Sequence, residues 1–199
     1  MKNIYLILFI FLIKFTNGSA LIKVDITRGN LNPLPIAVSP LSSDKSTNQE
    51  LKKIIKKENL GKEISSVIEN NLKNSGLFNP LDPKAFLQEP SVAHLKPRFE
   101  DWALIKAQAL ITGKIVYEKE KLRVEFRLWD VLAGKEILAL AFTTAPNNWR
   151  RVGHIITDKV YERLTGEKGY FDTRIIYVAE EGPKTQRVKK LAIMDQDGF

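Results

Sequence analysis

Apolar residues recur every three or four positions in two long stretches of the chain, and this spacing predicts two main helices. In residues 61–74 the stripe consists of Ile64, Val67, Ile68 and Leu72. Gly76 suits the left-handed position that ends a helix, and Asn79-Pro80 then keeps the chain extended. The second helix starts at Pro146-Asn147, where a residue without an N–H is tolerated, and ends at Gly166. Its stripe consists of Trp149, Val152, Ile156, Val160 and Leu164.

Other stretches alternate between apolar and polar residues, and a period of two predicts strands. In residues 121–131 the apolar face is Leu122, Val124, Phe126 and Leu128. The mostly apolar run 107–117 suits a central strand, and residues 136–143 predict a third strand. Short turns join these three, so we expect an antiparallel meander. The apolar run 34–38 lies between prolines and predicts a further buried strand.

Together these elements predict an α/β fold over residues 21–166, with a mixed sheet of about five strands flanked by two main helices. The polar composition of residues 39–50 indicates a loop. Residues 51–58 predict one or two helical turns, whose lysines we interpret as a solvated face. Residues 90–97 are expected to be irregular, and residues 98–106 predict a short helix.

Residues 167–199 have a different pattern. Two strands, 173–179 and 188–194, are separated by a polar turn with Gly182-Pro183, and they predict a hairpin. A two-stranded hairpin alone is marginally stable in water. The sequence reaches Phe199 where a further strand is needed, so we expect the chain to be a truncated product or a fragment of a longer reading frame.

The first twenty residues have the layout of a secretory signal peptide. Lys2 precedes an apolar run, residues 4–13, and the small residues Gly18-Ser19-Ala20 follow. We expect cleavage between Ala20 and Leu21, which predicts an exported protein without stable membrane insertion. An uncleaved N-terminal anchor is the alternative. The sequence has no Cys, which excludes a lipid-anchored lipoprotein, disulfides and thiolate metal sites.

The formal net charge of +8 raises the question of nucleic-acid binding, but the export signal argues against it. The two histidines, His94 and His154, lack further ligands at the spacing that a metal site needs. We interpret Asp195 and Asp197 as turn residues, because two carboxylates fall short of a calcium loop. No catalytic residue, metal ligand or cofactor site is therefore predicted.

At the start of the last predicted helix, an aromatic residue of the apolar stripe is followed by two basic residues. We interpret Trp149 as an anchor in the core, with Arg150 and Arg151 as solvated guanidinium groups. Stacking of this group on a ligand is the alternative.

Four stretches of the sequence resemble the TolB family. The most informative runs from Val67 to Asp82 and contains Asn-Ser-Gly-Leu-Phe-Asn-Pro-Leu. The others are residues 101–113 with Asp-Trp and Ile-Thr-Gly, 148–166 with Asn-Trp-Arg-Arg-Val and Glu-Arg-Leu-Thr-Gly, and 170–178 with Tyr-Phe-Asp-Thr-Arg-Ile-Ile-Tyr-Val. The resemblance implies a TolB-like N-terminal α/β domain over residues 21–166. It also implies that residues 167–199 are the truncated start of a β-propeller, an incomplete first blade.

The resemblance further implies a non-enzymatic periplasmic adaptor of the Tol-Pal system. Such a protein links the inner-membrane protein TolA with the outer-membrane lipoprotein Pal, and it supports envelope integrity and outer-membrane constriction during cell division. Pal contacts are expected mainly in the part of the propeller that this chain does not contain.

In the TolB family the first mature residues engage TolA. The matching positions here are Leu21, Ile22, Lys23, Val24, Asp25, Ile26, Thr27, Arg28, Gly29, Asn30, Leu31 and Asn32. Residues 21–27 alternate, so they also predict a strand that could add to the edge of a partner's sheet. A permanent edge strand of the chain's own domain fits the same alternation, and both interpretations stay open.

Two other classes of function remain as alternatives. A periplasmic enzyme, such as a cell-wall hydrolase, would need a cluster of catalytic side chains in a cleft. A basic α/β nucleic-acid-binding domain would need an export signal that does not function.

Overall fold

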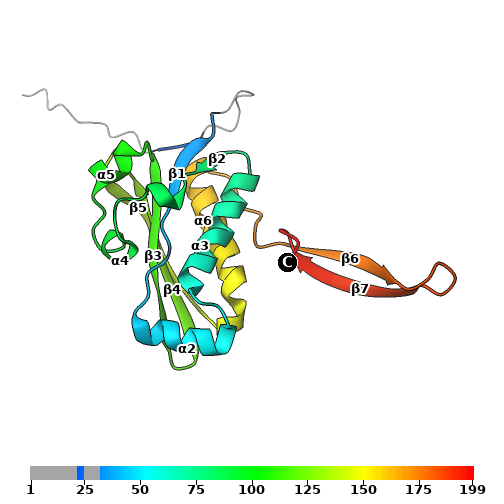
Figure 1. Cartoon of the computed structure of the whole chain (residues 1–199). Helices are drawn as coiled ribbons and strands as arrows, with labels where there is room; N and C mark the ends of the chain where they lie inside the picture. The colour runs from blue at the N-terminus through cyan, green and yellow to red at the C-terminus, as the bar shows by residue number, and fades with distance from the viewer. Residues whose placement is uncertain (1–21, 25–31) are drawn as a thin grey trace, which may run out of the picture.

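The central feature of the computed structural model, which describes residues 22–24 and 32–199, is one mixed sheet (Figure 1). Its strand order is β2-β1-β3-β4-β5. Strand β1 is parallel to both of its neighbours, β2 and β3, whereas β3, β4 and β5 form an antiparallel meander with β3 at the centre of the sheet. The strands are β1 (Leu34–Val38), β2 (Phe78–Pro80), β3 (Ala109–Glu118), β4 (Lys121–Asp130) and β5 (Lys135–Thr144). The predicted mixed five-stranded sheet is confirmed.

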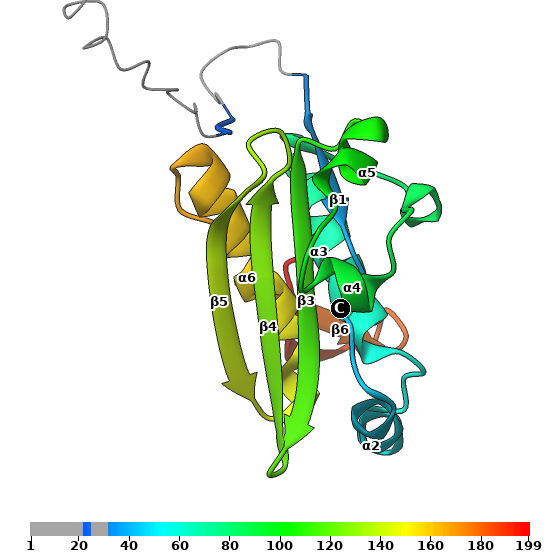
Figure 2. The ribbon, with the colours of Figure 1, turned by 90° about the vertical axis from the view of Figure 1, so that its left-hand side faces the viewer.

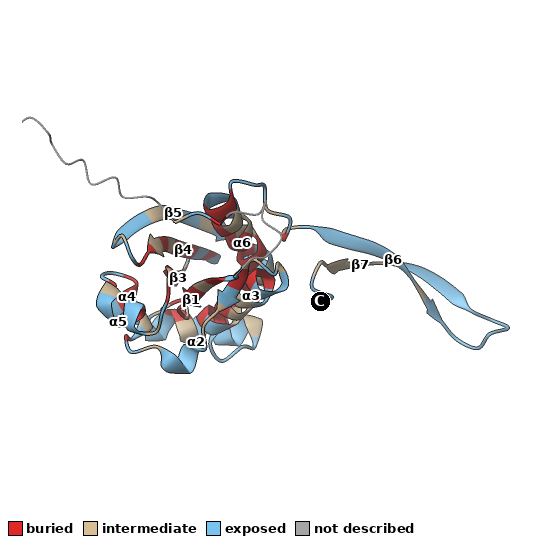
Figure 3. Ribbon diagram, turned by 90° about the horizontal axis from the view of Figure 1, so that it is seen from above, coloured by how far each residue is buried: buried red, intermediate tan, exposed pale blue. Residues whose placement is uncertain are grey.

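Two long helices cover one face of this sheet. They are α3 (Leu60–Asn74) and α6 (Trp149–Thr165), and both lie on the same side of the sheet (Figure 3). Their apolar stripes share one buried core with alternate residues of β4. The two helices approach each other closely at Gly153, where a Cβ would lie 2.9 Å from Val67 Cγ1. Glycine permits this approach because it has no side chain.

The ends of these helices follow the signals in the sequence. The side chain of Asn59 accepts a hydrogen bond from Lys62 N at 3.0 Å and caps the start of α3. Gly76 and Gly166 have positive φ values of 72° and 85° just beyond α3 and α6. The predicted glycine ends are therefore confirmed. A 3₁₀ turn (Pro146–Asn148) forms the predicted start of the last helix, and regular α-helix begins at Trp149.

Helix α2 (Lys45–Ile55) corrects the prediction of a loop over residues 39–50. Asp44 starts this helix, because its side chain accepts a hydrogen bond from Thr47 N at 2.6 Å. The same backbone N–H lowers the pKa of the Asp44 carboxyl. Only Thr47 and Leu51 of α2 are buried. Most positions of this helix are therefore polar, and its sequence has the composition of a loop.

The opposite face of the sheet is covered at one end only, by short helices (Figure 2). They are α4 (Pro90–Ala93), which lies in a stretch predicted to be irregular, and α5 (Phe99–Leu104). Trp102 of α5 is 1% exposed and donates its indole N–H to Gln88 Oε1 at 3.1 Å. A 3₁₀ turn (Pro83–Ala85) precedes them. This layer forms a second, smaller core around Ala37, Leu110 and Val131.

The predicted hairpin is present as a separate two-stranded sheet, β6 (Arg174–Glu181) and β7 (Val188–Asp195). It projects away from the first sheet and its helices, which we call the α/β unit (residues 32–166) (Figure 1). Most of its apolar side chains are in solvent, and Leu191 is 81% exposed. Whether this hairpin belongs to a propeller blade stays a prediction, as does the domain division at residue 167.

Two further predictions concern the membrane and export. Within residues 22–24 and 32–199, none of the helices combines the length and the apolar character needed to cross a bilayer. The predicted signal peptide and its cleavage site between Ala20 and Leu21 lie outside the described residues.

Candidate functional site

The predicted TolA-type segment is described in part, at Ile22, Lys23, Val24 and Asn32. Leu21 and residues 25–31 lie outside the described residues. Backbone atoms hold the first part: Ile22 N donates to Asp130 Oδ2 at 3.0 Å, and Val24 N donates to Leu164 O at 2.8 Å. The side chain of Val24 is 9% exposed and packs on the main core. The described residues 22–24 carry no regular strand, although the alternation predicted one.

A groove of about 470 Å³ lies beside this segment, between the end of α6 and the start of β5. Its lining combines two apolar residues with three basic side chains and one acidic side chain. The lining residues are Ile22, Lys23, Leu138, Lys159, Glu162, Arg163 and Gly166. Within it Lys159 pairs with Glu162 at 2.8 Å, and Arg163 Nε donates to Ile137 O at 2.8 Å. The groove is therefore predominantly basic, and an anionic ligand fits it better than a cationic one.

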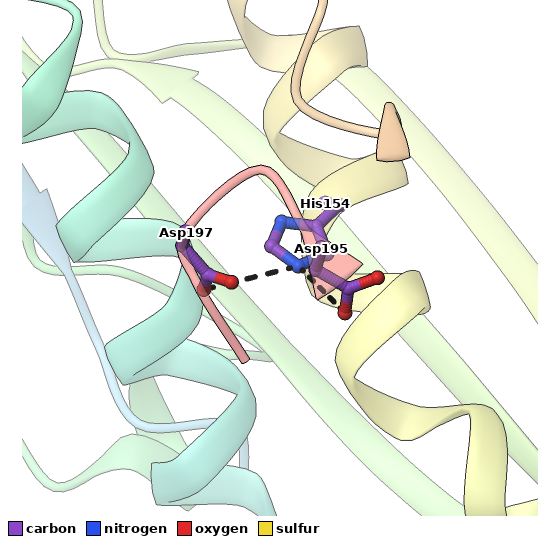
Figure 4. Close-up of side chains that lie close together, drawn as sticks. All are labelled: His154, Asp195 and Asp197. Carbon is purple, nitrogen blue, oxygen red and sulfur yellow. Dashed lines mark ion pairs between the residues drawn. The ribbon is translucent and has the colours of Figure 1, made fainter. Parts of the chain in front are cut away.

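The end of the hairpin makes a second cluster, against the middle of α3 and the start of α6 (Figure 4). We call it the C-terminal clamp and define it by Arg150, His154, Asp195 and Asp197. Arg150 Nη2 pairs with Asp197 Oδ2 at 2.5 Å, and its guanidinium lies 3.8 Å from the centre of the Phe199 ring. His154 Nε2 lies 3.6 Å from Asp195 Oδ2 and 3.9 Å from Asp197 Oδ2. Charge pairing thus joins the hairpin to α6.

Neighbouring polar groups determine which ring nitrogen of His154 carries the proton. Thr157 Oγ1 donates to Gly153 O at 2.8 Å, so it accepts from the amide nitrogen of Asn71 at 3.2 Å. The same nitrogen lies 2.9 Å from His154 Nδ1, which therefore acts as the acceptor. In a neutral ring the proton is then on Nε2, the atom that faces Asp195 and Asp197.

The clamp also contains the atoms of a conceivable metal site. One ligand atom each from His154, Asp195 and Asp197 lies within 4.8 Å of the others. Two observations oppose metal binding. The Arg150 guanidinium already neutralises Asp197, and the tautomer of His154 places a proton where a metal would need a lone pair. We therefore assign the cluster to structure and derive no metal chemistry from it.

A carboxylate in the middle of α6 holds the linker (residues 167–173). Asp158 Oδ1 accepts from Phe171 N at 2.7 Å, and Oδ2 accepts from Asp172 N at 3.1 Å. Arg151 then pairs with Asp172 at 3.0 Å. Phe171 is 1% exposed and packs on the ring of Tyr161. The chain therefore returns along α6 after Gly166 before the hairpin begins.

One carboxyl group in the α/β unit has an unusual pKa. Burial, and then the nearby charge of Asp82, raise the pKa of Glu69 from 4.5 to about 7. Both groups line a cavity of about 300 Å³ with Asn70, Lys73, Pro80, Leu81 and Pro83. A carboxyl group with a raised pKa near a second carboxyl group is an arrangement that acid–base catalysis can use. Sequence reasoning did not find the pair, because the two residues lie in different elements.

The structure changes the interpretation of several residues near α6. Trp149 is 8% exposed and belongs to the main core, as predicted. Arg150 was wrongly predicted to be solvated, since its side chain is 18% exposed and bound by two aspartates. Asp195 does form the predicted turn, with Gly198 N donating to its carbonyl at 3.0 Å, but its carboxylate also belongs to the clamp.

Comparison with known proteins agrees with this geometry. A family model described as the TolB amino-terminal domain matches residues 22–137, which is more than half of the chain. The chain belongs to the TolB family. The Tol-Pal system protein TolB of Pelagibacter ubique (strain HTCC1062) is 77% identical over 190 residues, which cover 96% of this chain and 43% of that protein.

A solved structure supports the same fold. The crystal structure of TolB from Acinetobacter baumannii matches with a TM-score of 0.63 at 24% identity. The match covers 83% of this chain and 37% of that one. The chain therefore spans less than half the length of these two relatives.

Proposed function

We propose that this member of the TolB family acts as a non-enzymatic adaptor of the Tol-Pal system in the periplasm. The observation that carries the proposal is the 77% identity to a Tol-Pal system protein TolB over nearly the whole chain. In this proposal residues 21–32 bind TolA. Pal binds mainly to the part of the relatives that this chain does not span, so the chain alone retains TolA binding and binds Pal weakly or not at all.

The contacts of the segment support an exchange mechanism. Ile22 and Val24 are attached by two backbone N–H groups and one buried side chain, a set of contacts that a partner strand can replace. The segment docks on its own protein in one state and extends to TolA in the other. A partner that favours one state shifts the population, and this couples the two partners without covalent chemistry.

Calorimetry with the C-terminal domain of TolA tests the site. The chain from residue 21 onward is expected to bind, and the same chain without residues 21–32 is expected not to bind. If both forms bind equally, residues 21–32 are not the TolA site. If neither binds, the adaptor proposal is wrong for this chain. Pal captured as tightly as by a full-length homologue would contradict the assignment of Pal contacts.

A single substitution tests the exchange. Asp130→Ala removes the carboxylate that holds Ile22 N and so favours the undocked segment. The apparent affinity for TolA is then expected to rise several-fold, because the binding-competent fraction rises. Asp101→Ala, which removes an exposed ion pair with Arg98, is the control and leaves the affinity unchanged. Unaltered affinity in Asp130→Ala would contradict the exchange mechanism.

The pair of Glu69 and Asp82 makes a hydrolase the alternative that can be tested most directly. The adaptor proposal expects Glu69→Gln to bind TolA normally and to support the envelope in cells. Loss of envelope integrity in this variant, with TolA binding intact, would favour the enzyme.

A further inference from the structure

The two edges of the sheet differ strongly. The β2 edge has three residues and ends in Pro80, which has no N–H to offer another strand. The β5 edge has ten residues, and in the described part of the chain β4 is the only strand that pairs with it. Outside the sheet, Arg163 Nε donates to Ile137 O near the start of β5. Figure 2 shows its outer side running the length of the unit without a covering element. One edge is thus blunted and the other is open.

The open edge lacks the charges that normally protect such strands. Residues 137–144 read Ile-Leu-Ala-Leu-Ala-Phe-Thr-Thr and contain no charged side chain. Ala139 and Ala141 are exposed, and Leu140 is 38% exposed. An exposed, long and uncharged edge is a template for pairing with another strand.

The end of this edge near Leu138 is different, because its strand pairing is irregular and the groove beside it is basic. Ile137 has no partner on β4, since Leu128 pairs with Leu138 and Trp129 pairs with Glu136. This bulge interrupts the regular pairing of β5 with β4 beside the groove of Lys23, Lys159 and Arg163. A strand added to β5 therefore meets a concentration of positive charge at the end next to Leu138.

We propose that residues 138–144 of β5 accept an extended segment of a partner protein as an added antiparallel strand, with acidic residues of that segment seated in the basic groove. An antiparallel segment places its last residues at Leu138, so the acidic residues lie at its C-terminal end. The β5 edge itself lies outside the TolA-type segment, although Ile22 and Lys23 of that segment line part of the groove. The test uses neither TolA nor Pal.

Charge favours such a partner over a second copy of this chain. Pairing two β5 edges across a two-fold axis places the basic groove of each copy near the other end of the opposite strand. The chain carries a net charge of +8, so two copies repel each other, whereas an acidic segment is attracted.

Hydrogen exchange with two synthetic ten-residue peptides tests the proposal. Both alternate threonine and valine; one ends in three glutamates and the other in three lysines. The acidic peptide is expected to slow exchange of the β5 amides several-fold and to bind at least tenfold more tightly than the basic one. Salt should reduce this difference, because the groove is open to solvent.

Matched variants locate the charge effect. The double variant Lys159→Glu with Arg163→Glu is expected to bind the acidic peptide at least tenfold more weakly. The control, Lys52→Glu with Lys53→Glu, makes the same change of charge on α2 and is expected to change the affinity less than twofold. Lys159→Glu alone, which keeps the contact of Arg163 with Ile137 O, serves if the double variant fails to fold.

Three results would overturn the proposal. The first is equal binding of the two peptides, or no slowing at β5 by the acidic peptide at millimolar concentration. The second is a concentration-dependent dimer with protected β5 amides, which would make a second copy the occupant. The third is β5 protection in the free chain that disappears when residues 21–32 are removed, which would assign the edge to the chain's own segment.

Discussion

Strand β4 and strand β6 are both rich in apolar residues, yet they have opposite environments. Leu122, Val124 and Phe126 of β4 are at most 1% exposed, because α3 and α6 cover them. Ile176 of β6 is 71% exposed, because nothing within residues 22–24 and 32–199 packs as a second layer on either face of the hairpin. The comparison teaches that a strand's sequence supplies an apolar face, while burial comes from the layer that packs on it. The hairpin is held instead at its base, by polar contacts.

The largest expected effect is the loss of a core side chain in the α/β unit. Phe126→Ala removes a ring that is 1% exposed and is expected to lower the free energy of unfolding by about 3–5 kcal/mol. Ile176→Ala in the hairpin is the matched control, with an expected change within about 0.5 kcal/mol. Urea unfolding followed by circular dichroism measures both. Similar losses in the two variants would refute the contrast between the strands.

The next largest effect on stability is expected where α3 and α6 approach each other closely. Gly153→Ala places a Cβ 2.9 Å from Val67 Cγ1 and is expected to destabilise the protein by about 1–3 kcal/mol, although alanine favours helices. Val67→Ala creates the missing space. The double variant should therefore lose less than the sum of the single losses, and an additive double-mutant cycle would show that the contact is unimportant.

The raised pKa of Glu69 predicts how stability changes with pH. Near pH 4 the carboxyl is protonated in the folded and the unfolded chain, so Glu69→Gln has little effect. Above pH 4.5 the unfolded chain releases this proton more readily than the folded chain does, until the folded pKa of about 7 is passed. Glu69→Gln is then expected to be more stable than the wild type by about 1–2 kcal/mol at pH 8. Urea titrations at pH 4 and pH 8 compare the two proteins. A pH-independent difference would show that this pKa is not raised.

The smallest effect on global stability is expected at the C-terminal clamp. Arg150→Ala removes the partner of Asp197 and the cation over Phe199. Unfolding free energy should change by about 1 kcal/mol or less, while amide exchange in residues 195–199 should accelerate about tenfold. Arg174→Ala is the control and should have less effect on exchange. The side chain of Arg174 is 57% exposed, and its Nε lies 3.9 Å from Asp195 Oδ1. Unchanged exchange after Arg150→Ala would mean that other contacts hold the turn.

Local patterns in the sequence predicted most of the fold because most elements carry their own signals. The stripe of α3, its glycine end and the alternation of β4 each lie within a few residues. The first half of helix α2 was missed, because its evidence consists of one capping aspartate and two buried residues, whereas helical turns were predicted from residue 51 onward. Part of its apolar contact is supplied by β3, which lies far along the chain.

The clamp could not be predicted, for a related reason. His154 and Arg150 lie on α6, Asp195 and Asp197 follow β7, and Asn71 comes from α3. No spacing rule connects three elements that meet only in the folded chain. A solvated arginine and a buried one have the same sequence pattern, so the environment of Arg150 became visible only when its partners were in place.

The attachment of the linker to Asp158 has a mechanical consequence. The chain leaves α6 at Gly166, returns along the helix, and is bound at Phe171 and Asp172 before the hairpin starts. A force applied to the hairpin therefore reaches α6 through Asp158 and Arg151, and also through the C-terminal clamp at the start of the helix. A chain that left directly from the helix end would instead peel away one contact at a time. Movement of the hairpin is thus coupled to α6, the helix that covers the sheet, and not to the helix end alone.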